Sequence, residues 1–371
     1  MKKTFVVLGL FLFLAAASAN AQVKKDYPAG VSPKDRVTGA IMGVLIGDAL
    51  GVGCHWYYDL SILHEDFGPW ISGYLDPKTE SKNNFAPVAK QRYKVGVRAG
   101  DVSQTGQLLT LLLESVAAKG TYDRNDFASR VDEFFKTIDG TNYSGRYTDQ
   151  AIRETWKNRH SGIGWDDPAV GSNAITSEAA QMGVVLAALY HKNAEEVAKQ
   201  AYRNTTLFYR NDFAIGQSAA YVLSVAGFMS GVPLKDIKSY ARTIPSESKS
   251  KYAPYADTQM QIETGAALAW TPEIKFDPPT LVAQIYGAHC EIQQLLPGAY
   301  YLIHRYPDDF ESAVLTAVNS GGNNMARAAL TGGMSGAMNG LSGIPKRFID
   351  GLKDHERLLK LAEKVADLAA K

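Results

Sequence analysis

Two acids and one histidine are the residues whose types and surroundings best suit chemistry. Asp48 stands inside the apolar run 46–51, where an acid is rare unless it is paired or hydrogen-bonded. We interpret it either as an acid of a functional cleft or as a structural acid that caps a neighbouring helix. His55 lies seven residues further on and is directly followed by Trp56 and Tyr57. Such rings suit a sugar or a nucleobase, although aromatic clusters also serve ordinary packing at helix ends.

A second polar segment opens a leucine-rich helix. Asp101 and Gln104 have the spacing of a capping box, which predicts that Asp101 caps this helix. A carboxylate at a positive helix end also stays ionised and available as a base or ligand. Gly100 and Ser103 flank it as candidate substrate contacts. The candidate catalytic residues are therefore Asp101, His55 and Asp48.

A third polar segment, 319–324, precedes another predicted helix. Gly321 and Gly322 allow tight turns, and Asn323 and Asn324 stand where the helix begins. Free N–H groups at a helix N-terminus bind phosphate or carboxylate. The phosphate-binding patterns GxGxxG and GxxxxGK[ST] are both absent, so mononucleotide-binding folds are not indicated. The candidate substrate-binding residues are Gly100, Ser103, Trp56, Tyr57, Gly321, Gly322, Asn323 and Asn324.

Two glycine ladders identify the elements that must position these residues. Each ladder has a glycine at every fourth position, which places its members on one helix face. A glycine inside a helix costs about 0.8–1.0 kcal/mol relative to alanine, so close approach of two helices is the simplest compensating benefit. We therefore predict two central helices packed side by side. The ladders are Gly39, Gly43, Gly47 and Gly51, and Gly332, Gly336 and Gly340.

The periodicity of the rest of the chain is helical. Ser32, Pro33 and Asp35 form a helix start, and a core-facing stripe recurs with period 3.6 at Met182, Val185, Leu186 and Leu189. Sustained period-two alternation is absent, so the sequence predicts an all-α fold, as one helical domain from residue 22 to 371. The predicted loops are 68–93, 140–177, 245–257 and 271–279.

Composition and charge exclude several classes of protein. The chain has 371 residues, a formal net charge of +1 and 46% hydrophobic residues, so it can bury a large core and is not disordered. Because there is no basic excess, we expect no nucleic-acid partner. Only Cys54 and Cys290 are present, which excludes a cysteine-rich zinc site. The two thiols either pair or stay free.

The first 21 residues read as a signal peptide. Lys2 and Lys3 precede the apolar run 5–17, and Ala19-Asn20-Ala21 is a small-x-small cleavage site. The apolar run is shorter than the roughly 20 residues that span a bilayer. We therefore expect no membrane span and a periplasmic or secreted product.

Three of these segments resemble the ADP-ribosylglycohydrolase family. Residues 37–51 (VTGAIMGVLIGDALG) are similar to its opening helix, and residues 310–340 to its C-terminal region with Gly-Gly-Asp-Thr-Asp-Thr. The segment from Asp101 stands where the family has a Thr-Asp-Asp-Thr motif that opens a helix. The resemblance covers nearly all of the chain after the signal peptide. It implies an all-α domain with a central cleft, two magnesium ions, and hydrolysis of a glycosidic bond of ADP-ribose.

The metal motifs depart from that family. The first motif aligns with Gly100, Asp101, Val102 and Ser103, and the second with Asn323, Asn324, Met325 and Ala326. The family's acid after the opening helix falls at His55. Hard cations need oxygen ligands, preferably charged. We therefore expect neither a dinuclear magnesium centre nor any other cofactor.

Three functions stay open. The chain is a metal-free hydrolase, with Asp101 as base or nucleophile, His55 as acid, and Asn323 and Asn324 holding sugar hydroxyls. Alternatively it is a non-catalytic member that binds a sugar, a nucleotide or an ADP-ribose derivative, or a hydrolase with one weak metal at Asp101. We favour the first, acting on a glycosidic bond of a sugar, nucleoside or ADP-ribose derivative outside the cytoplasm.

Overall fold

The fold is built from helices. The computed structural model describes residues 30–254, 256 and 259–370. In these ranges there is no sheet, only three isolated β-bridges, so the all-α prediction is confirmed. The α-helices are α1 (Pro33–Val52), α2 (Leu60–Phe67), α3 (Ala86–Lys94), α4 (Gln104–Lys119), α5 (Arg124–Phe135), α6 (Gln150–His160), α7 (Glu178–Met182), α8 (Val184–Tyr190), α9 (Ala194–Thr205), α10 (Asp212–Met229), α11 (Ile237–Arg242), α12 (Ser246–Tyr252), α13 (Gln259–Trp270), α14 (Val282–Tyr286), α15 (Ile292–Arg305), α16 (Phe310–Asn319), α17 (Asn324–Asn339), α18 (Lys346–Gly351) and α19 (His355–Ala370).

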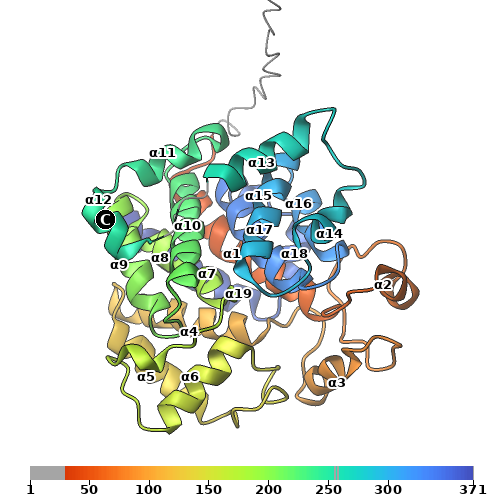
Figure 1. The fold of residues 1–371 in the computed structure, drawn as a ribbon, viewed down its shortest axis with the longest axis horizontal. Helices are drawn as coiled ribbons and strands as arrows, with labels where there is room; N and C mark the ends of the chain where they lie inside the picture. The colour runs from red at the N-terminus through yellow and green to blue at the C-terminus, as the bar shows by residue number, and fades with distance from the viewer. Residues whose placement is uncertain (1–29, 255, 257–258, 371) are drawn as a thin grey trace, which may run out of the picture.

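Helices α1 and α17 pack against each other through the centre of the molecule (Figure 1). Their glycine faces meet: an ideal Cβ on Gly43 would lie 2.1 Å from the carbonyl oxygen of Gly332, and one on Gly336 would lie 2.1 Å from that of Gly39. Only glycine permits backbones this close. The predicted pairing of the two ladders is confirmed.

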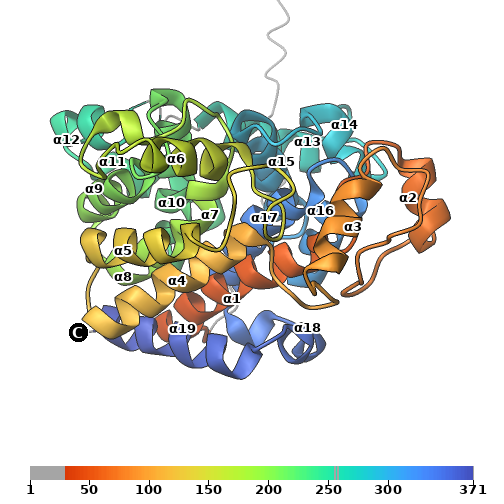
Figure 2. The same cartoon turned by 90° about the horizontal axis from the view of Figure 1, so that it is seen from below.

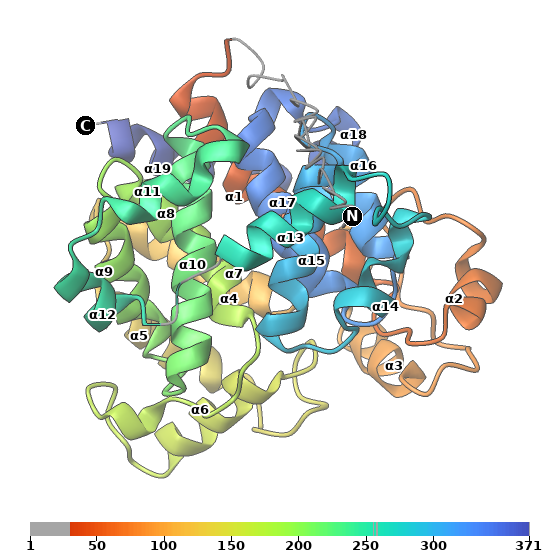
Figure 3. The same ribbon diagram turned by 45° about the horizontal axis from the view of Figure 1, so that its top comes forward.

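Other helices enclose this central pair. Helices α10, α15 and α16 pack on α17, while α8 and α19 pack on α1. Helix α19 follows α1 and α4 along one side of the molecule (Figure 2). The short helices α2 and α3 extend from one end of this body (Figure 3). The described helices share one main hydrophobic core.

The first helix starts where the sequence predicts. The Ser32 side chain accepts a hydrogen bond from the Asp35 backbone N–H at 3.1 Å, and Pro33 occupies the first turn. The stripe from Met182 to Leu189, in contrast, is divided between α7 and α8 at Gly183. An ideal Cβ at Gly183 would lie 2.3 Å from a Val222 methyl group, so α10 comes too close for another residue there.

Three of the predicted loops contain helices. Helix α3 begins within the predicted loop 68–93 and ends one residue beyond it, while α6 lies within 140–177 and α12 within 245–257. Helix α6 escaped sequence analysis because it buries only Ala151, Ile152 and Thr155, too few apolar residues for a clear period. This omission matters, since the start of α6 forms part of the candidate site.

The predicted signal peptide lies outside the described residues. In the described part of the chain, no helix combines the length and apolar character needed to cross a bilayer.

Candidate functional site

A narrow cleft lies where the first turns of α4, α7 and α17 and the residue before α6 come together. Most of its polar lining comes from these helix starts, and Cys290 precedes α15. Helix N-termini carry partial positive charge and exposed N–H groups, which favours anionic or polar ligands. The lining residues are Thr105, Asp149, Ser177, Glu178, Gln181, Cys290, Asn323, Met325 and Ala326.

The two asparagines before and in α17 have different roles. Asn323 lines the cleft and caps α17, since its side-chain oxygen accepts a hydrogen bond from the Ala326 backbone N–H at 3.3 Å. Asn324 is fully buried and donates to the Cys54 sulfur at 3.2 Å. Cys54 and Cys290 are both free thiols, so the described structure contains no disulfide between them.

His55 is buried beside Asn324, away from the cleft lining. Its Nδ1 lies 3.1 Å from the Asn324 side-chain oxygen, and its ring stacks on Trp56 with centroids 4.6 Å apart. Burial, reinforced by the Arg92 guanidinium, lowers the pKa of His55 well below its usual value. His55 is therefore neutral at physiological pH, which does not suit the expected role of general acid.

Asp48 fixes the start of α4. Its carboxylate accepts hydrogen bonds from the backbone N–H and the hydroxyl of Ser103, both at 2.6 Å. Burial raises the pKa of Asp48 to about 6, and the two Ser103 hydrogen bonds oppose that rise. Of the two interpretations, this geometry supports the structural acid.

The expectation that Asp101 caps α4 is wrong. The N-cap is Ser103, whose hydroxyl accepts from the Gly106 backbone N–H at 3.2 Å. The Asp101 carboxylate instead forms ion pairs with Arg146 at 3.3 Å and Lys353 at 3.1 Å. Asp101 is not among the described residues that line the cleft.

The glycines that were predicted to contact a substrate pack against other parts of the protein instead. Gly322 donates its backbone N–H to the Tyr57 carbonyl oxygen at 2.5 Å, and an ideal Cβ on Gly321 would lie 2.6 Å from the same oxygen. An ideal Cβ on Gly100 would lie 2.1 Å from the carbonyl oxygen of Gly351. These glycines permit close backbone contacts, and none of the three is in the cleft lining of the described structure.

The aromatic rings form a cluster next to the cleft. Trp56 lies 4.9 Å from Phe85 and 5.7 Å from Tyr147 between ring centroids, and Tyr58 lies 5.2 Å from His289. Tyr147 has φ of 79° and stands two residues before the cleft residue Asp149. A non-glycine residue held in this left-handed region is a form of strain found at functional sites. The Tyr57 hydroxyl, in contrast, donates to Asp66 at 2.6 Å.

Sequence analysis missed five polar residues of the cleft: Thr105, Asp149, Ser177, Glu178 and Gln181. Asp149 and Glu178 are its two carboxylic acids. Both stand at helix starts within or beside the predicted loop 140–177, and no motif marked them. The available signal was an acid at each helix start, Thr148-Asp149-Gln150 and Ser177-Glu178, which is also typical of ordinary capping.

A buried arginine lies close to these acids. Arg92 of α3 is only 1% exposed and donates to the backbone oxygens of Arg146 and Val52 at 3.2 and 3.3 Å. Its charge opposes the rise in the pKa of both Asp48 and Asp149. A fixed cation beside the cleft favours anionic ligands and disfavours metal cations.

The side chains of the two segments that correspond to the family's metal motifs do not fit a magnesium centre. The segment expected to hold the first motif, Gly100–Ser103, ends at the N-cap of α4, and none of its four residues lines the cleft in the described structure. The cleft there presents the Thr105 hydroxyl, the Asn323 amide, the Met325 thioether and the Ala326 methyl group. The two carboxylic acids of the cleft, Asp149 and Glu178, lie outside these positions, and the described residues contain no group of three or more His, Cys, Asp or Glu side chains that could hold a metal ion. Magnesium requires charged oxygen ligands that this set lacks.

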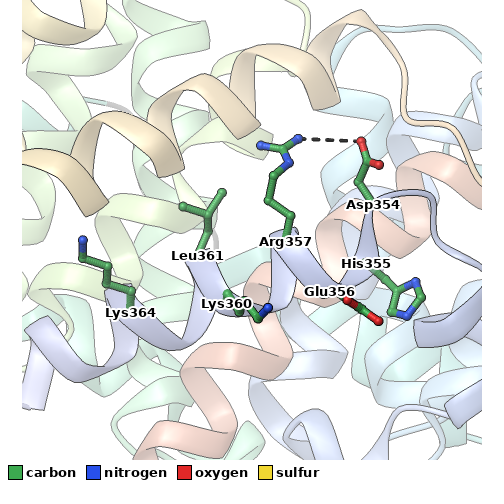
Figure 4. A pocket seen from close by; sticks show the side chains of 7 residues that line it. All are labelled: Asp354, His355, Glu356, Arg357, Lys360, Leu361 and Lys364. Carbon is green, nitrogen blue, oxygen red and sulfur yellow. Dashed lines mark ion pairs between the residues drawn. The ribbon is translucent and has the colours of Figure 1, made fainter.

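A larger hollow of about 610 Å³ lies over α19. Figure 4 shows its lining, which runs from Asp354 to Lys364 and contains the ion pair between Arg357 and Asp354. The hollow is open to solvent and its charged side chains all come from the single segment 354–364, whereas the cleft, with a volume of about 10 Å³, brings together polar groups from several helix starts. We therefore assign the candidate site to the cleft.

Two full-length relatives are similar to this chain at low identity. A protein of Archaeoglobus fulgidus is 23% identical over 341 residues, covering 90% of this chain and 97% of its own. Crystallin J1A of Tripedalia cystophora is 22% identical over 354 residues, covering 91% and 98%. ADP-ribosylarginine hydrolase Tri1 of Serratia proteamaculans is 42% identical, but only over 62 residues, or 17% of each chain.

A solved structure shares the fold of this chain, and a family model covers most of its length. A solved structure described as an ADP-ribosylglycohydrolase-related protein complex superimposes with a TM-score of 0.62 and 17% identity, covering 91% of this chain and 99% of that chain. The sequence model of ADP-ribosylglycohydrolase matches residues 29–371. The chain belongs to the ADP-ribosylglycohydrolase family.

Proposed function

We propose that the protein hydrolyses a glycosidic bond in an ADP-ribose derivative, or in a related nucleoside or sugar, without a dinuclear magnesium centre. The observation that carries this proposal is the composition of the cleft. It contains two carboxylic acids, Asp149 and Glu178, while Asn323, Met325 and Ala326 replace the second metal motif. A hydrolase needs groups that handle protons, and the cleft offers them without a metal.

The surroundings of the cleft support a nucleoside or sugar as ligand. The cluster around Trp56 and Tyr147 provides ring faces, which pack well on sugars and bases. Asn323 and Gln181 supply amide groups for hydroxyl recognition. The Serratia relative named as an ADP-ribosylarginine hydrolase supports an ADP-ribose derivative as the first substrate to test.

Metal independence is tested with a peptide that carries ADP-ribosylated arginine. We expect release of ADP-ribose at the same rate with and without EDTA, and no specific magnesium binding by calorimetry, because the cleft lacks charged oxygen ligands at the metal positions. Loss of turnover in EDTA that magnesium restores would contradict the proposal. Binding of ADP-ribose without any turnover would instead favour the non-catalytic alternative.

A single weak metal at Asp101 has less support. The carboxylate of Asp101 is already paired with Arg146 and Lys353. A cation would have to displace both positive charges.

Export is also part of the proposal. Its support is the sequence 1–21, with Lys2 and Lys3 before the apolar run and a small-x-small site at its end. We expect the mature protein, recovered from the periplasm or the medium, to begin at Gln22. An intact N-terminus in the cytoplasmic fraction would contradict export.

A further inference from the structure

We propose that Asp149 and Glu178 are the proton-transfer pair of the cleft, with Asp149 as general acid and Glu178 as general base. The proposal rests on the proposed hydrolytic function and assigns its chemistry to residues outside the family's two metal motifs. Both side chains line the same narrow cleft from different elements.

Asp149 stands at the N-terminus of α6, but its side chain does not cap the helix. It is the N-cap residue of α6, yet its side chain makes no capping hydrogen bond. Asp123 at the N-cap of α5 behaves as expected and accepts hydrogen bonds from the backbone N–H groups of Asn125 and Asp126. The Asp149 carboxyl has no hydrogen bond or ion pair with any described residue, and it faces the cleft.

Only one of the two carboxylate oxygens of Glu178 accepts hydrogen bonds from described side chains. Its Oε2 accepts hydrogen bonds from the hydroxyls of Thr176 and Tyr209. Its Oε1 has no hydrogen-bond partner within the described part of the chain, and Glu178 lines the cleft. Hydrogen bonds donated to a carboxylate stabilise its charged form, so Glu178 is the member of the pair better suited to be ionised.

Two further polar groups of the cleft have no protein partner. The Thr105 hydroxyl and the Asn323 side-chain N–H groups belong to residues that are 2% and 4% exposed. Both residues line the cleft, and neither group forms a hydrogen bond to a described residue. Both groups are therefore free to form hydrogen bonds with a polar ligand in the cleft.

Burial and neighbouring charges act differently on the pKa values of Asp149 and Glu178. Burial, and then the charge of Glu178, raises the pKa of Asp149 far above its usual range; Asp48 adds to this rise, while Arg92 and Arg153 oppose it. Burial also raises the pKa of Glu178, against its two hydroxyl donors. Burial raises the pKa of the neighbouring Cys290 thiol to about 12, so it stays neutral. Two hydroxyl donors stabilise the charged form of Glu178, whereas no hydrogen-bond donor of the described structure stabilises a charged Asp149, so Asp149 is the member of the pair better suited to hold the proton.

This arrangement gives a balanced hydrolysis. Water attacks the anomeric carbon of the ligand as the bond from that carbon to the leaving nitrogen or oxygen breaks. Glu178 takes one proton from the water, and Asp149 gives its proton to the leaving atom. Proton transfer from Glu178 to Asp149 then restores the starting state. No oxidant, reductant or metal ion enters this sequence.

The test compares Asp149→Asn, Glu178→Gln and the control Asp123→Asn with the wild type, using the peptide that carries ADP-ribosylated arginine. We expect kcat to fall by about 10²-fold or more in the first two variants and to stay unchanged in the control, with KM little affected. In the pH profile of kcat/KM, Asp149→Asn should remove the alkaline limb and Glu178→Gln the acidic limb. Thermal unfolding of each variant verifies that it folds.

The outcomes separate this proposal from the proposed function. If the wild type turns over the peptide and Asp149→Asn keeps more than a third of that activity, the function stands and the pair is wrong. If the wild type shows no turnover, the hydrolytic function is wrong for this substrate. The pair is then tested by calorimetry of ADP-ribose binding in two buffers of different ionisation enthalpy. Proton uptake or release that Asp149→Asn abolishes supports the pair, and binding without such linkage, or no binding, overturns it.

Discussion

Replacing Gly43 by alanine is expected to destabilise the protein by about 3 kcal/mol or more, and replacing it by leucine to prevent folding. Alanine is the better helix former by about 0.8–1.0 kcal/mol, so helix propensity alone predicts the opposite sign. The reason is the contact between α1 and α17. A Cβ at Gly43 would lie 2.1 Å from the Gly332 carbonyl oxygen, and both atoms belong to helix backbones that cannot move aside locally.

The control for this prediction is Gly73→Ala. Gly73 has no described atom within 4 Å of its ideal Cβ and does not have positive φ, so this variant should unfold within about 0.5 kcal/mol of the wild type. Urea denaturation followed by circular dichroism gives the free energies of unfolding. A Gly43→Ala variant as stable as the wild type would show that the two helices are not in backbone contact.

The pairing of α1 and α17 was predictable because it depends on residue type alone. Glycine at every fourth position has few physical explanations, and Gly39, Gly43 and Gly336 all lie against backbone of the facing helix. The all-α class was predictable for a similar reason, since the burial of apolar stripes such as Leu108, Leu112 and Val116 imposes a helical period.

The candidate site was predicted only in part. Asn323 lies on the cleft as expected, but Asp101 does not, because Ser103 rather than Asp101 caps α4. Ser103 stands directly before the first residue of α4 and Asp101 three positions before it, and both residue types are common N-caps. Only the packed structure shows that Arg146 and Lys353 neutralise Asp101.

Asp149 and Glu178 could not be recognised from the sequence for a different reason. An acid at a helix start is normally a cap, and Asp149 differs from Asp123 only in where its side chain points. That direction depends on α4, α7 and α17, which are distant in sequence. The buried cation Arg92 is equally hidden, because α3 is a short helix with mostly polar residues.

Asp48→Asn is expected to stabilise the protein at alkaline pH and to keep its activity. Burial raises the pKa of Asp48 from 3.8 to about 6. Well below pH 3.8 the acid is protonated in both folded and unfolded chains, so its burial costs no ionisation energy. Between about pH 3.8 and 6 the unfolded chain loses this proton while the folded protein keeps it, so stability falls by about 3 kcal/mol across this range and then stays level. The asparagine variant avoids this cost and can still accept the Ser103 backbone hydrogen bond.

The free energy of unfolding of Asp48→Asn, relative to the wild type, should therefore rise by about 2.5 kcal/mol between pH 4 and pH 8, and most of this rise should occur below pH 6. Taking the difference between the two proteins cancels the titration of buried histidines such as His55 and His304, whose lowered pKa values act in the opposite direction with pH. Turnover measured at pH 8 decides the role of the residue. Retained activity fits a structural acid that holds Ser103 at the start of α4, whereas a loss of 10²-fold in a stable variant would return Asp48 to the catalytic residues.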